Sequence, residues 1–338
     1  MLRIGLIARY DNSGLGTMCW EFARHLKPVK VLLVSNGIYQ TFPERYDEFE
    51  TRTNPSRNVF SNEIKDWLTE DIDVLLTIET FYDHSIIKTC RTKGVKTAQL
   101  TMCELLPSKI PIYPDLFLCP SKLDMEMTPE HNKVLVPPPF NLDKLKWKKR
   151  DRARVFVHTA SHGGISGRKG THFILEAMKH VKSDIKLIIY SWRSFVCNDP
   201  RVEVRVQNFK NYWQCWQEGD VLIYPQDFNG ICLPICEAMC SGMAVITTNI
   251  FPFNEYLHPD LMFDPTGFRD VRVSPTLVKV KGAIIDPKKI AEKIDLIANK
   301  DIGKYSEFGK KWAEKNSWGV LLPRYVKILE ELCKEPSE

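Results

Sequence analysis

The stretch that decides the fold is NGICLPICEAMCSGMAVITT, residues 229–248. A glycine and a proline open it, a run of helical character follows, and AVITT has the composition of a buried strand. One carboxylate, Glu237, lies among Leu, Ile, Cys and Met side chains, where burial is costly unless a partner hydrogen-bonds it. We expect a helix that begins near Ile235, with Glu237 in its first turn and a ligand as its partner. The alternative is an ordinary helix-start acid that suits the helix dipole.

Short apolar runs alternate with amphipathic segments on both sides of this stretch. The strand-like runs are RIGLIAR, KVLLVS, VLLTIE, KTAQLTM and DLFLCPS in the first half, and VFVHTAS, KLIIYSW, VEVRVQ, DVLIYPQ and AVITTN in the second. Apolar runs of this length between helices predict parallel sheets covered on both faces. The run VPPPFNLDKLKWKKRDRAR, residues 136–154, interrupts the pattern with three prolines and dense basic charge, which is typical of a linker.

We therefore expect an α/β chain of two tandem Rossmann-like, doubly wound domains that face a central cleft. The domains are residues 1–143 and 154–319, with a basic linker at 144–153 and a C-terminal helix at about 320–338 that packs back on the first domain. The length of 338 residues agrees, because single cores stop growing near ~250–300 residues. Ligands of such folds bind at the carboxyl ends of the strands.

Composition excludes several classes of protein. Hydrophobic residues make up 43% and charged residues 26%, as in ordinary soluble globular proteins. The net charge of +5 permits anionic partners but lacks the clustered excess of a dedicated nucleic-acid binder. The N-terminal MLRIGLIARY is interpreted as a first strand rather than a signal peptide, and no window approaches the ~20 apolar residues of a membrane span. We expect a cytoplasmic protein, of a cell or of an infected host cell.

The ten cysteines lie mostly in apolar runs, which indicates buried thiols in a reducing compartment. Cys232, Cys236 and Cys240 recur every four residues, and their shared helix face allows either small-residue packing or a metal cluster. The nearby sequence offers no histidine to complete a metal site, so we favour packing. Asp71 and Asp73 have the spacing of a metal-binding DxD, but they precede the strand VLLTIE and are interpreted as a turn leading into it.

Two glycine-rich loops follow strands. Gly14 and Gly16 come after the first strand, where they suit either close approach to a ligand or a tight turn. In the second loop, HGGISGRKGTHF, four glycines surround Arg168 and Lys169 just before a helix near Thr171. Glycine-rich backbone and two cations at a helix N-terminus suit a diphosphate, although a solvated basic turn is the alternative. A Walker A loop is excluded, because Gly170 follows the lysine.

Taken together, these motifs resemble the retaining glycosyltransferases of family 4, which have the GT-B fold. Residues 229–245 resemble that family's pattern E-G-F-G-L-P-x-x-E-A-M-A-x-G-x-P-V, and GRKGTHFILEA is similar to its R-K-G-x-x-x-L-L-x-A loop. GLGTMCWEFARHL, LFLCPSKLD and FNEYL, with Glu255, resemble its first glycine loop, a strand with a serine-started helix, and its proline-glutamate turn. The resemblance runs from Ile4 to about Val278. Bacteriophage-type members of the family are among the proteins that the chain resembles.

The resemblance implies a nucleotide sugar held mainly by the C-terminal domain. Glu237 matches the glutamate that hydrogen-bonds the ribose hydroxyls, and Lys169 and Arg168 match the cations that bind the diphosphate. The backbone N–H groups of residues 231–233 match the loop that contacts phosphate and donor sugar. The implied donor-binding residues are Gly14, Gly16, His162, Gly163, Gly164, Arg168, Lys169, Asn229, Gly230, Ile231, Cys232, Leu233 and Glu237. The candidate catalytic residues are Glu104, Asn229 and Lys169.

The sequence departs from the family pattern at three places. Asn229 replaces the first glutamate of the motif, so a sugar hydroxyl would meet an amide without charge, and Asp227 is placed to compensate. The family's arginine before the lysine is missing, and Arg168 or His162 is its substitute. Many members have histidine where this chain has Glu104, which would position the acceptor hydroxyl, act as a base or be an ordinary loop acid.

The expected reaction moves a sugar from a UDP- or GDP-linked donor to an acceptor hydroxyl with retention, without a metal or other cofactor. The acceptor is a glycan, a lipid-linked glycan or DNA. The basic run at 144–154 around Trp147, with the aromatics of NYWQCWQ and SWRSF, would suit a large anionic acceptor such as the hydroxymethylated DNA of phage-type enzymes, or an anionic lipid surface. We favour the alternative, in which the run is a solvated hinge and the tryptophans are core residues. Asn229 also leaves open a non-catalytic binder of nucleotide sugars, whereas an epimerase or a phosphorylase fits less well.

Overall fold

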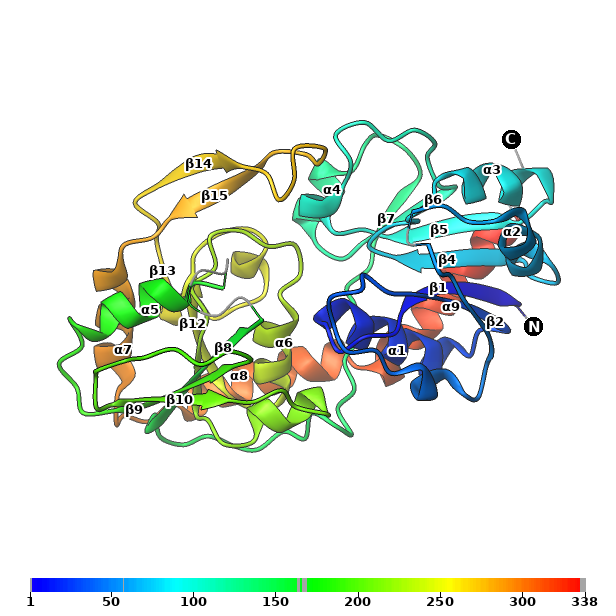
Figure 1. Cartoon of the computed structure of the whole chain (residues 1–338). Coiled ribbons are helices and arrows are strands. Elements are labelled where there is room, and N and C mark those ends of the chain that lie inside the picture. Colours follow the sequence, from blue (N-terminus) through cyan, green and yellow to red (C-terminus); the bar gives the residue numbers. More distant parts are fainter. Residues whose placement is uncertain (1, 57, 163–164, 166–168, 335–338) are drawn as a thin grey trace. The chain divides into compact units, whose positions relative to one another are not determined.

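The computed structural model describes residues 2–56, 58–162, 165 and 169–334. The chain divides into two compact units (Figure 1). Unit 1 consists of Met1–Pro139, Arg272–Val278 and Trp318–Glu338, and unit 2 of Phe140–Val271 and Lys279–Ser317. The basic segment 144–153 therefore belongs to unit 2, and the last helix belongs to unit 1.

Unit 1 is built on a seven-stranded sheet in the order β3-β2-β1-β4-β5-β6-β7, with every neighbouring pair parallel. Its strands are β1 (Ile4–Arg9), β2 (Lys30–Val34), β3 (Glu50–Thr53), β4 (Val74–Ile78), β5 (Lys96–Leu100), β6 (Leu116–Cys119) and β7 (Lys133–Leu135). Its helices are α1 (Gly14–Leu26), α2 (Asn62–Thr69), α3 (Ser85–Thr92), α4 (Lys122–Met127) and α9 (Trp318–Lys334), with short 3-10 turns η1 (Pro43–Tyr46) and η2 (Cys103–Leu105).

Helices cover both faces of this sheet, so its central strands are buried throughout. Every residue of β1, β2, β4 and β5 is buried. On one face, α1 and α9 pack together through Phe22, whose ring centroid lies 5.0 Å from that of Trp318 and 5.2 Å from that of Tyr325. On the other face, α2 and α3 bury Ile64 and Ile86 in one cluster with the strand residues.

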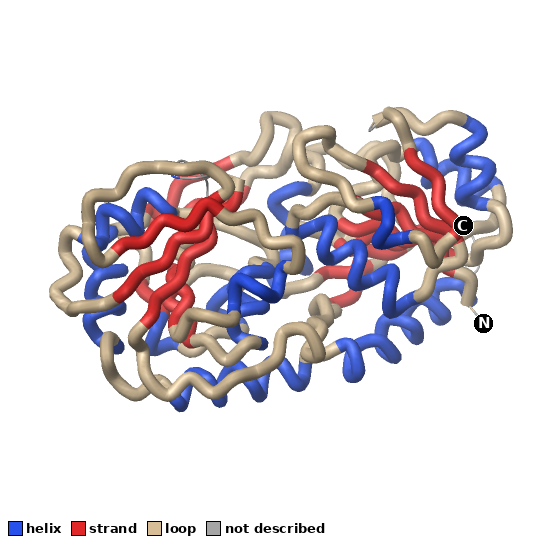
Figure 2. Tube along the Cα trace, turned by 60° about the horizontal axis from the view of Figure 1, so that its bottom comes forward, coloured by secondary structure: helices blue, strands red, loops and turns tan. Residues whose placement is uncertain are grey.

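Unit 2 repeats the architecture with a six-stranded parallel sheet in the order β10-β9-β8-β11-β12-β13. Its strands are β8 (Val155–Ser161), β9 (Lys186–Ser191), β10 (Val202–Val206), β11 (Val221–Ile223), β12 (Ala244–Thr248) and β13 (Met262–Phe263). Its helices are α5 (Thr171–Met178), α6 (Leu233–Cys240), α7 (Pro287–Ile297) and α8 (Gly303–Lys315), with 3-10 turns η4 (Tyr212–Trp216), η5 (Phe253–Glu255) and η6 (Pro259–Leu261). Figure 2 shows the strands of each unit as one twisted layer flanked by helices.

The expected pair of doubly wound parallel sheets is confirmed, and two local expectations need revision. A two-stranded antiparallel hairpin, β14 (Gly267–Val271) and β15 (Val280–Ile284), was not anticipated from the sequence. Helix α6 begins at Leu233 rather than near Ile235, because Pro234 fits the first turn, where no intrahelical N–H bond is lost. Glu237 therefore lies in the second turn, and the dipole explanation for it is correspondingly weaker.

Strand order reverses once in each sheet, between β1 and β4 and between β8 and β11. Ligands of doubly wound sheets bind at such a reversal, outside the carboxyl ends of the strands. In unit 2 the segments that follow these two strands are residues 162–170 and 224–232, which are the loops that the sequence motifs single out.

Candidate functional site

The two motif loops of unit 2 touch where α5 begins. Gly170 has a φ of +77°, and a Cβ atom at this position would lie 2.1 Å from the carbonyl oxygen of Pro225. Only glycine accepts both the left-handed backbone and this approach. The loop after β8 is therefore held directly against the loop after β11.

A buried histidine also holds the two loops together where α5 begins. His158 of β8 is fully buried, with Nδ1 2.9 Å from the carbonyl oxygen of Ile223 and Nε2 2.9 Å from Oγ1 of Thr171. Burial lowers the pKa of His158 to about 3, so the ring is neutral. Nδ1–H must donate to the carbonyl, and Nε2 then accepts from the threonine hydroxyl. His158 was missed from the sequence, where its only signal is a polar letter inside VFVHTAS.

The helices that begin at these loops lack side-chain caps within the described part of the chain. Helix α5 follows Gly170, and α6 follows Cys232, whose side chain makes no capping hydrogen bond. In unit 1, by contrast, Ser13 and Ser61 accept hydrogen bonds from the first turns of α1 and α2. Uncapped first-turn N–H groups and the helix dipole favour an anionic ligand.

Glu237 has a partner inside the protein. Its side chain is 8% exposed, and Nε1 of Trp216 donates to its Oε2 over 3.0 Å. Trp216 ends η4 and is itself 2% exposed. The carboxylate therefore has one partner within the protein, and a ligand as a further partner stays a prediction. Trp216 was missed from the sequence, where its only signal is an aromatic letter inside NYWQCWQ.

Lys169 and Glu237 lie within electrostatic reach of the same thiol. The pKa of Cys215 is raised well above its ordinary value, first by burial and then by the charge of Glu237, whereas the charge of Lys169 lowers it. Lys169 also contributes to the lowered pKa of His158. The structure thus gathers the motif lysine and the motif glutamate around one point of unit 2.

The loop after β11 is held by its own polar side chains. Nδ2 of Asn229 donates to Oε1 of Gln226 over 2.7 Å. Asp227 is buried; its carboxylate accepts from Arg269 of β14 over 3.2 Å, and its carbonyl accepts from the backbone N–H of Ala283 in β15 over 2.8 Å. Burial raises the pKa of Asp227, and Arg269 opposes the shift. Asp227 therefore anchors the β14–β15 hairpin.

The remaining candidate donor residues of unit 2 fall into three groups. Gly230, Ile231 and Cys232 are buried and Leu233 is half-buried, so the donor contacts expected of this segment would come from its backbone. His162 is exposed beside Trp192, with ring centroids 5.9 Å apart. Gly163, Gly164 and Arg168 lie outside the described residues.

In unit 1, Gly16 is needed for local packing, because a Cβ atom there would lie 2.0 Å from the carbonyl oxygen of Asp11. Gly14 is the first residue of α1, which Ser13 caps. Glu104 lies in η2 and is only 3% exposed, with Sγ of Cys103 3.7 Å from its Oε2. The Glu104 carboxylate is therefore nearly buried, and its contact with an acceptor stays a prediction.

Close to Glu104, burial raises the pKa of Asp124 to about 7, and the charge of Glu104 acts in the same direction. The Asp124 carboxyl accepts from the backbone N–H of Cys103 over 2.7 Å. Two carboxyl groups thus share the carboxyl end of the unit 1 sheet.

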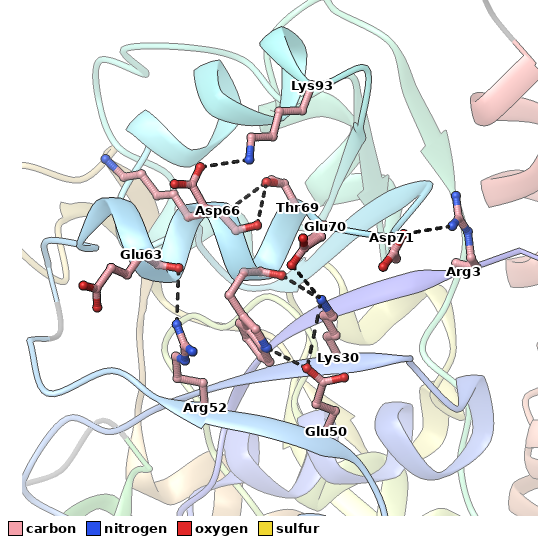
Figure 3. Close-up of polar contacts among 12 residues, drawn as sticks. Arg3, Lys30, Glu50, Arg52, Glu63, Asp66, Thr69, Glu70, Asp71 and Lys93 are labelled. Atoms are coloured by element: carbon pink, nitrogen blue, oxygen red, sulfur yellow. Dashed lines mark hydrogen bonds and ion pairs between the residues drawn. The ribbon is translucent and has the colours of Figure 1, made fainter.

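The DxD pair lies at the opposite, amino edge of that sheet. Nη2 of Arg3 is 2.7 Å from Oδ1 of Asp73. Nη1 of Arg3 is 3.8 Å from Oδ1 of Asp71 (Figure 3). Lys30 pairs with Glu50 and Glu70 in the same region (Figure 3). The DxD carboxylates thus have a structural partner in the turn before β4.

Among residues 2–56, 58–162, 165 and 169–334, no cluster of three or more His, Cys, Asp or Glu side chains has the arrangement of a metal site. Over the same ranges, no helix combines the length and apolar character that crossing a membrane requires. Cys232, Cys236 and Cys240 are buried free thiols.

The basic run at 144–154 packs on unit 2, and some of its cationic side chains make contacts within that unit. Arg150 is 5% exposed and donates to the carbonyl oxygens of Trp216 over 3.1 Å and Gln217 over 3.3 Å. Nζ of Lys144 lies 4.9 Å from the ring centroid of Trp213, and Trp147 donates to the carbonyl oxygen of Ser306. The exposed cations of the run are Lys146, Lys148, Lys149, Arg152 and Arg154.

Comparison with known proteins agrees with this geometry. Residues 154–297 match the family model described as glycosyl transferases group 1. No curated protein matches the chain. Among solved structures, the chain is similar to a glycosyltransferase from Rickettsia africae ESF-5, with a TM-score of 0.73 and 14% identity over 99% of both chains.

Two further solved structures share the fold. HepE of Anabaena, solved in complex with UDP and glucose, gives a TM-score of 0.68 at 10% identity over 98% of this chain and all of that one. The lipopolysaccharide outer core galactosyltransferase WaaB gives 0.67 at 14% identity over 98% of this chain and 99% of that one. The GT-B fold is thereby confirmed, and the group 1 domain on this fold makes the chain a glycosyltransferase.

Proposed function

We propose that this glycosyltransferase transfers a sugar from a nucleoside diphosphate sugar, with UDP as the first candidate carrier, to an acceptor hydroxyl with retention of anomeric configuration. The observation that carries the proposal is the set of loops and helix starts beyond β8 and β11. It combines two helix starts without side-chain caps, a lysine and a nearly buried glutamate in one electrostatic neighbourhood. UDP is preferred because HepE and the pneumococcal O-GlcNAc transferase GtfA were solved with UDP.

Each group has a role that its chemistry supports. Lys169 and the first-turn N–H groups of α5 and α6 offset the charge that develops on the departing diphosphate. Glu237 accepts hydrogen bonds from the ribose hydroxyls, and Asn229 contacts a hydroxyl of the donor sugar. We propose a metal-independent reaction of the family 4 type, in which the acceptor attacks from the face that the diphosphate leaves. Arg168, Gly163 and Gly164 complete the diphosphate loop in this proposal.

For the acceptor, we propose a glycan or a lipid-linked glycan, used in the cytoplasm. Glu104 is the candidate for orienting its hydroxyl. Phage-type transfer to hydroxymethylated DNA is supported by the five exposed cations of the 144–154 run. This DNA alternative is weakened because Arg150 is hydrogen-bonded inside unit 2 and the Lys144 ammonium lies over the ring of Trp213. Duplex DNA binding with a steep salt dependence would favour the DNA acceptor.

Release of free nucleotide from UDP-glucose, UDP-galactose, UDP-N-acetylglucosamine and GDP-mannose tests the proposal. We expect slow hydrolysis of one donor by the native chain and its loss in Lys169→Ala. Lys179→Ala is the matched control, because Lys179 directly follows α5, at the end opposite to Lys169, and pairs with Glu176 at the surface. A chain that binds a donor but never releases nucleotide is a non-catalytic binder, and that result would contradict the proposal.

A further inference from the structure

Glu237 is one member of a chain of hydrogen bonds that begins in the basic linker. Arg150 donates to the carbonyl oxygens of Trp216 and Gln217, and the Trp216 indole donates to Glu237. Arg150, Trp216 and Glu237 are 5%, 2% and 8% exposed. A hydrogen bond to an ionised group in such surroundings is stronger than one at the surface.

The short helix η4 that carries Trp216 is held at both ends. At its start, Asn211 and Gln214 form a reciprocal capping box. At its end, the Arg150 guanidinium takes up carbonyl oxygens that the helix leaves without partners. The backbone N–H of Arg150 in turn donates to Oγ of Ser306 over 3.1 Å, which ties the linker to α8. The indole N–H therefore has a fixed position from which to hold the carboxylate.

We infer that Trp216 is a positioning residue for the donor site: its indole N–H orients the Glu237 carboxylate so that the remaining lone pairs meet the ribose hydroxyls of the nucleotide. This rests on the proposed function of Glu237. An ionised carboxylate has about four lone-pair sites, so a bond from Trp216 is compatible with further hydrogen bonds from a diol. Arg150 supports the arrangement indirectly, because it holds the end of η4, the helix that carries the indole.

The three buried thiols near Glu237 do not compete with this role. The buried thiols of Cys215, Cys236 and Cys240 have pKa values raised well above the ordinary range, so they carry no charge that would repel the carboxylate. Lys169 provides the positive charge that acts in the same place. The orientation of Glu237 is thus set by the hydrogen bond and its charge is supported by the lysine.

The test removes the N–H and little else. Trp216→Phe deletes the donor, and replacement of Trp216 by β-(3-benzothienyl)alanine keeps the ring volume in case the phenylalanine variant folds poorly. Trp213→Phe is the matched control, since Trp213 is in the same short helix and stacks with Lys144 instead. The ligands are UDP and 2′-deoxy-UDP, titrated calorimetrically against the native chain, these variants and Glu237→Gln.

We expect both Trp216 replacements to bind UDP roughly ten- to hundredfold more weakly, as loss of a hydrogen bond to a charged group implies. The preference for UDP over 2′-deoxy-UDP should shrink as well, and acid should abolish binding at a higher pH than in the native chain, because the lost donor favours the ionised carboxylate. Trp213→Phe should keep native affinity and preference.

Native affinity and native preference in both Trp216 replacements, with binding weakened in Glu237→Gln, would overturn the positioning role and leave the proposed function standing. Equal loss of UDP and 2′-deoxy-UDP binding would also overturn it, because a general structural effect does not distinguish the two ligands. Absence of UDP binding by the native chain, or native binding by Glu237→Gln, would instead refute the donor-site assignment on which the inference rests.

Discussion

Gly170→Ala is the perturbation that most directly probes the contact between the two motif loops. Gly170 has a φ of +77°, which costs an alanine about 1–2 kcal/mol. The new Cβ atom would also start 2.1 Å from the Pro225 carbonyl oxygen, so the loop after β11 must retreat by about 1 Å. Forced repacking of this kind costs about 1–3 kcal/mol, so the free energy of unfolding should fall by about 2–5 kcal/mol in total.

Denaturant unfolding measures the stability loss, and calorimetric titration with UDP measures the effect on the site. Gly94→Ala is the control, because its φ of +70° is similar but nothing lies within 4 Å of the added Cβ. It should lose only the backbone part, about 1–2 kcal/mol, and bind UDP normally. Equal destabilisation of the two variants, with unchanged UDP affinity in both, would refute the argument that this contact shapes the site.

Three further outcomes follow from buried groups. Burial lowers the pKa of His158 to about 3, so below pH 6.5 this side chain is protonated in the unfolded chain but neutral in the folded chain. Native stability should fall as pH drops below about 6.5, by up to ~1.4 kcal/mol per pH unit, and His158→Gln should lose this slope in unfolding measured across pH. Asp124, with its pKa raised to about 7, holds a proton that the unfolded chain gives up from about pH 4, so stability falls as pH rises towards 7. Asp124→Asn should gain stability relative to the native chain between pH 5 and pH 8 in the same unfolding assay. Phe22→Ala removes the ring between α1 and α9 and should cost about 3–5 kcal/mol in denaturant unfolding.

Each of these three predictions would be contradicted by a specific result. A pH dependence that is the same in His158→Gln and the native chain would show that the ring is not held neutral in the fold. A stability difference between Asp124→Asn and the native chain that does not change with pH would show that the carboxyl is already ionised. A loss below 1 kcal/mol for Phe22→Ala would show that the two helices are not held by this ring.

The sequence was sufficient for the elements whose apolar runs are long. The strands β1, β2, β4 and β5 are buried throughout, so their composition alone distinguishes them. The edge strand β3 was missed, because all four of its residues, ETRT, are exposed and carry no apolar signal. The β14–β15 hairpin was missed because its tie to the rest of unit 2, through Asp227, joins positions far apart in the chain.

Separation along the chain also decides which site residues could be predicted from the sequence. Lys169, Asn229 and Glu237 belong to contiguous motifs and could be found by pattern. His158 bonds a carbonyl 65 positions away, and Trp216 donates to a carboxylate 21 positions away, so no local pattern contains either pair. Counting charges in the linker likewise could not reveal that Arg150 is buried against η4 while its neighbours stay exposed.

The measurement that tests the central claim most directly is calorimetric titration of the native chain and Glu237→Gln with UDP, GDP and ADP. The account predicts that the native chain binds one of these nucleotides, with UDP the first candidate, and that Glu237→Gln binds it at least about tenfold more weakly, because an amide replaces the charged acceptor of the ribose hydroxyls. Binding of none of the three by the native chain, or equal binding by Glu237→Gln, would contradict a donor site beyond β8 and β11.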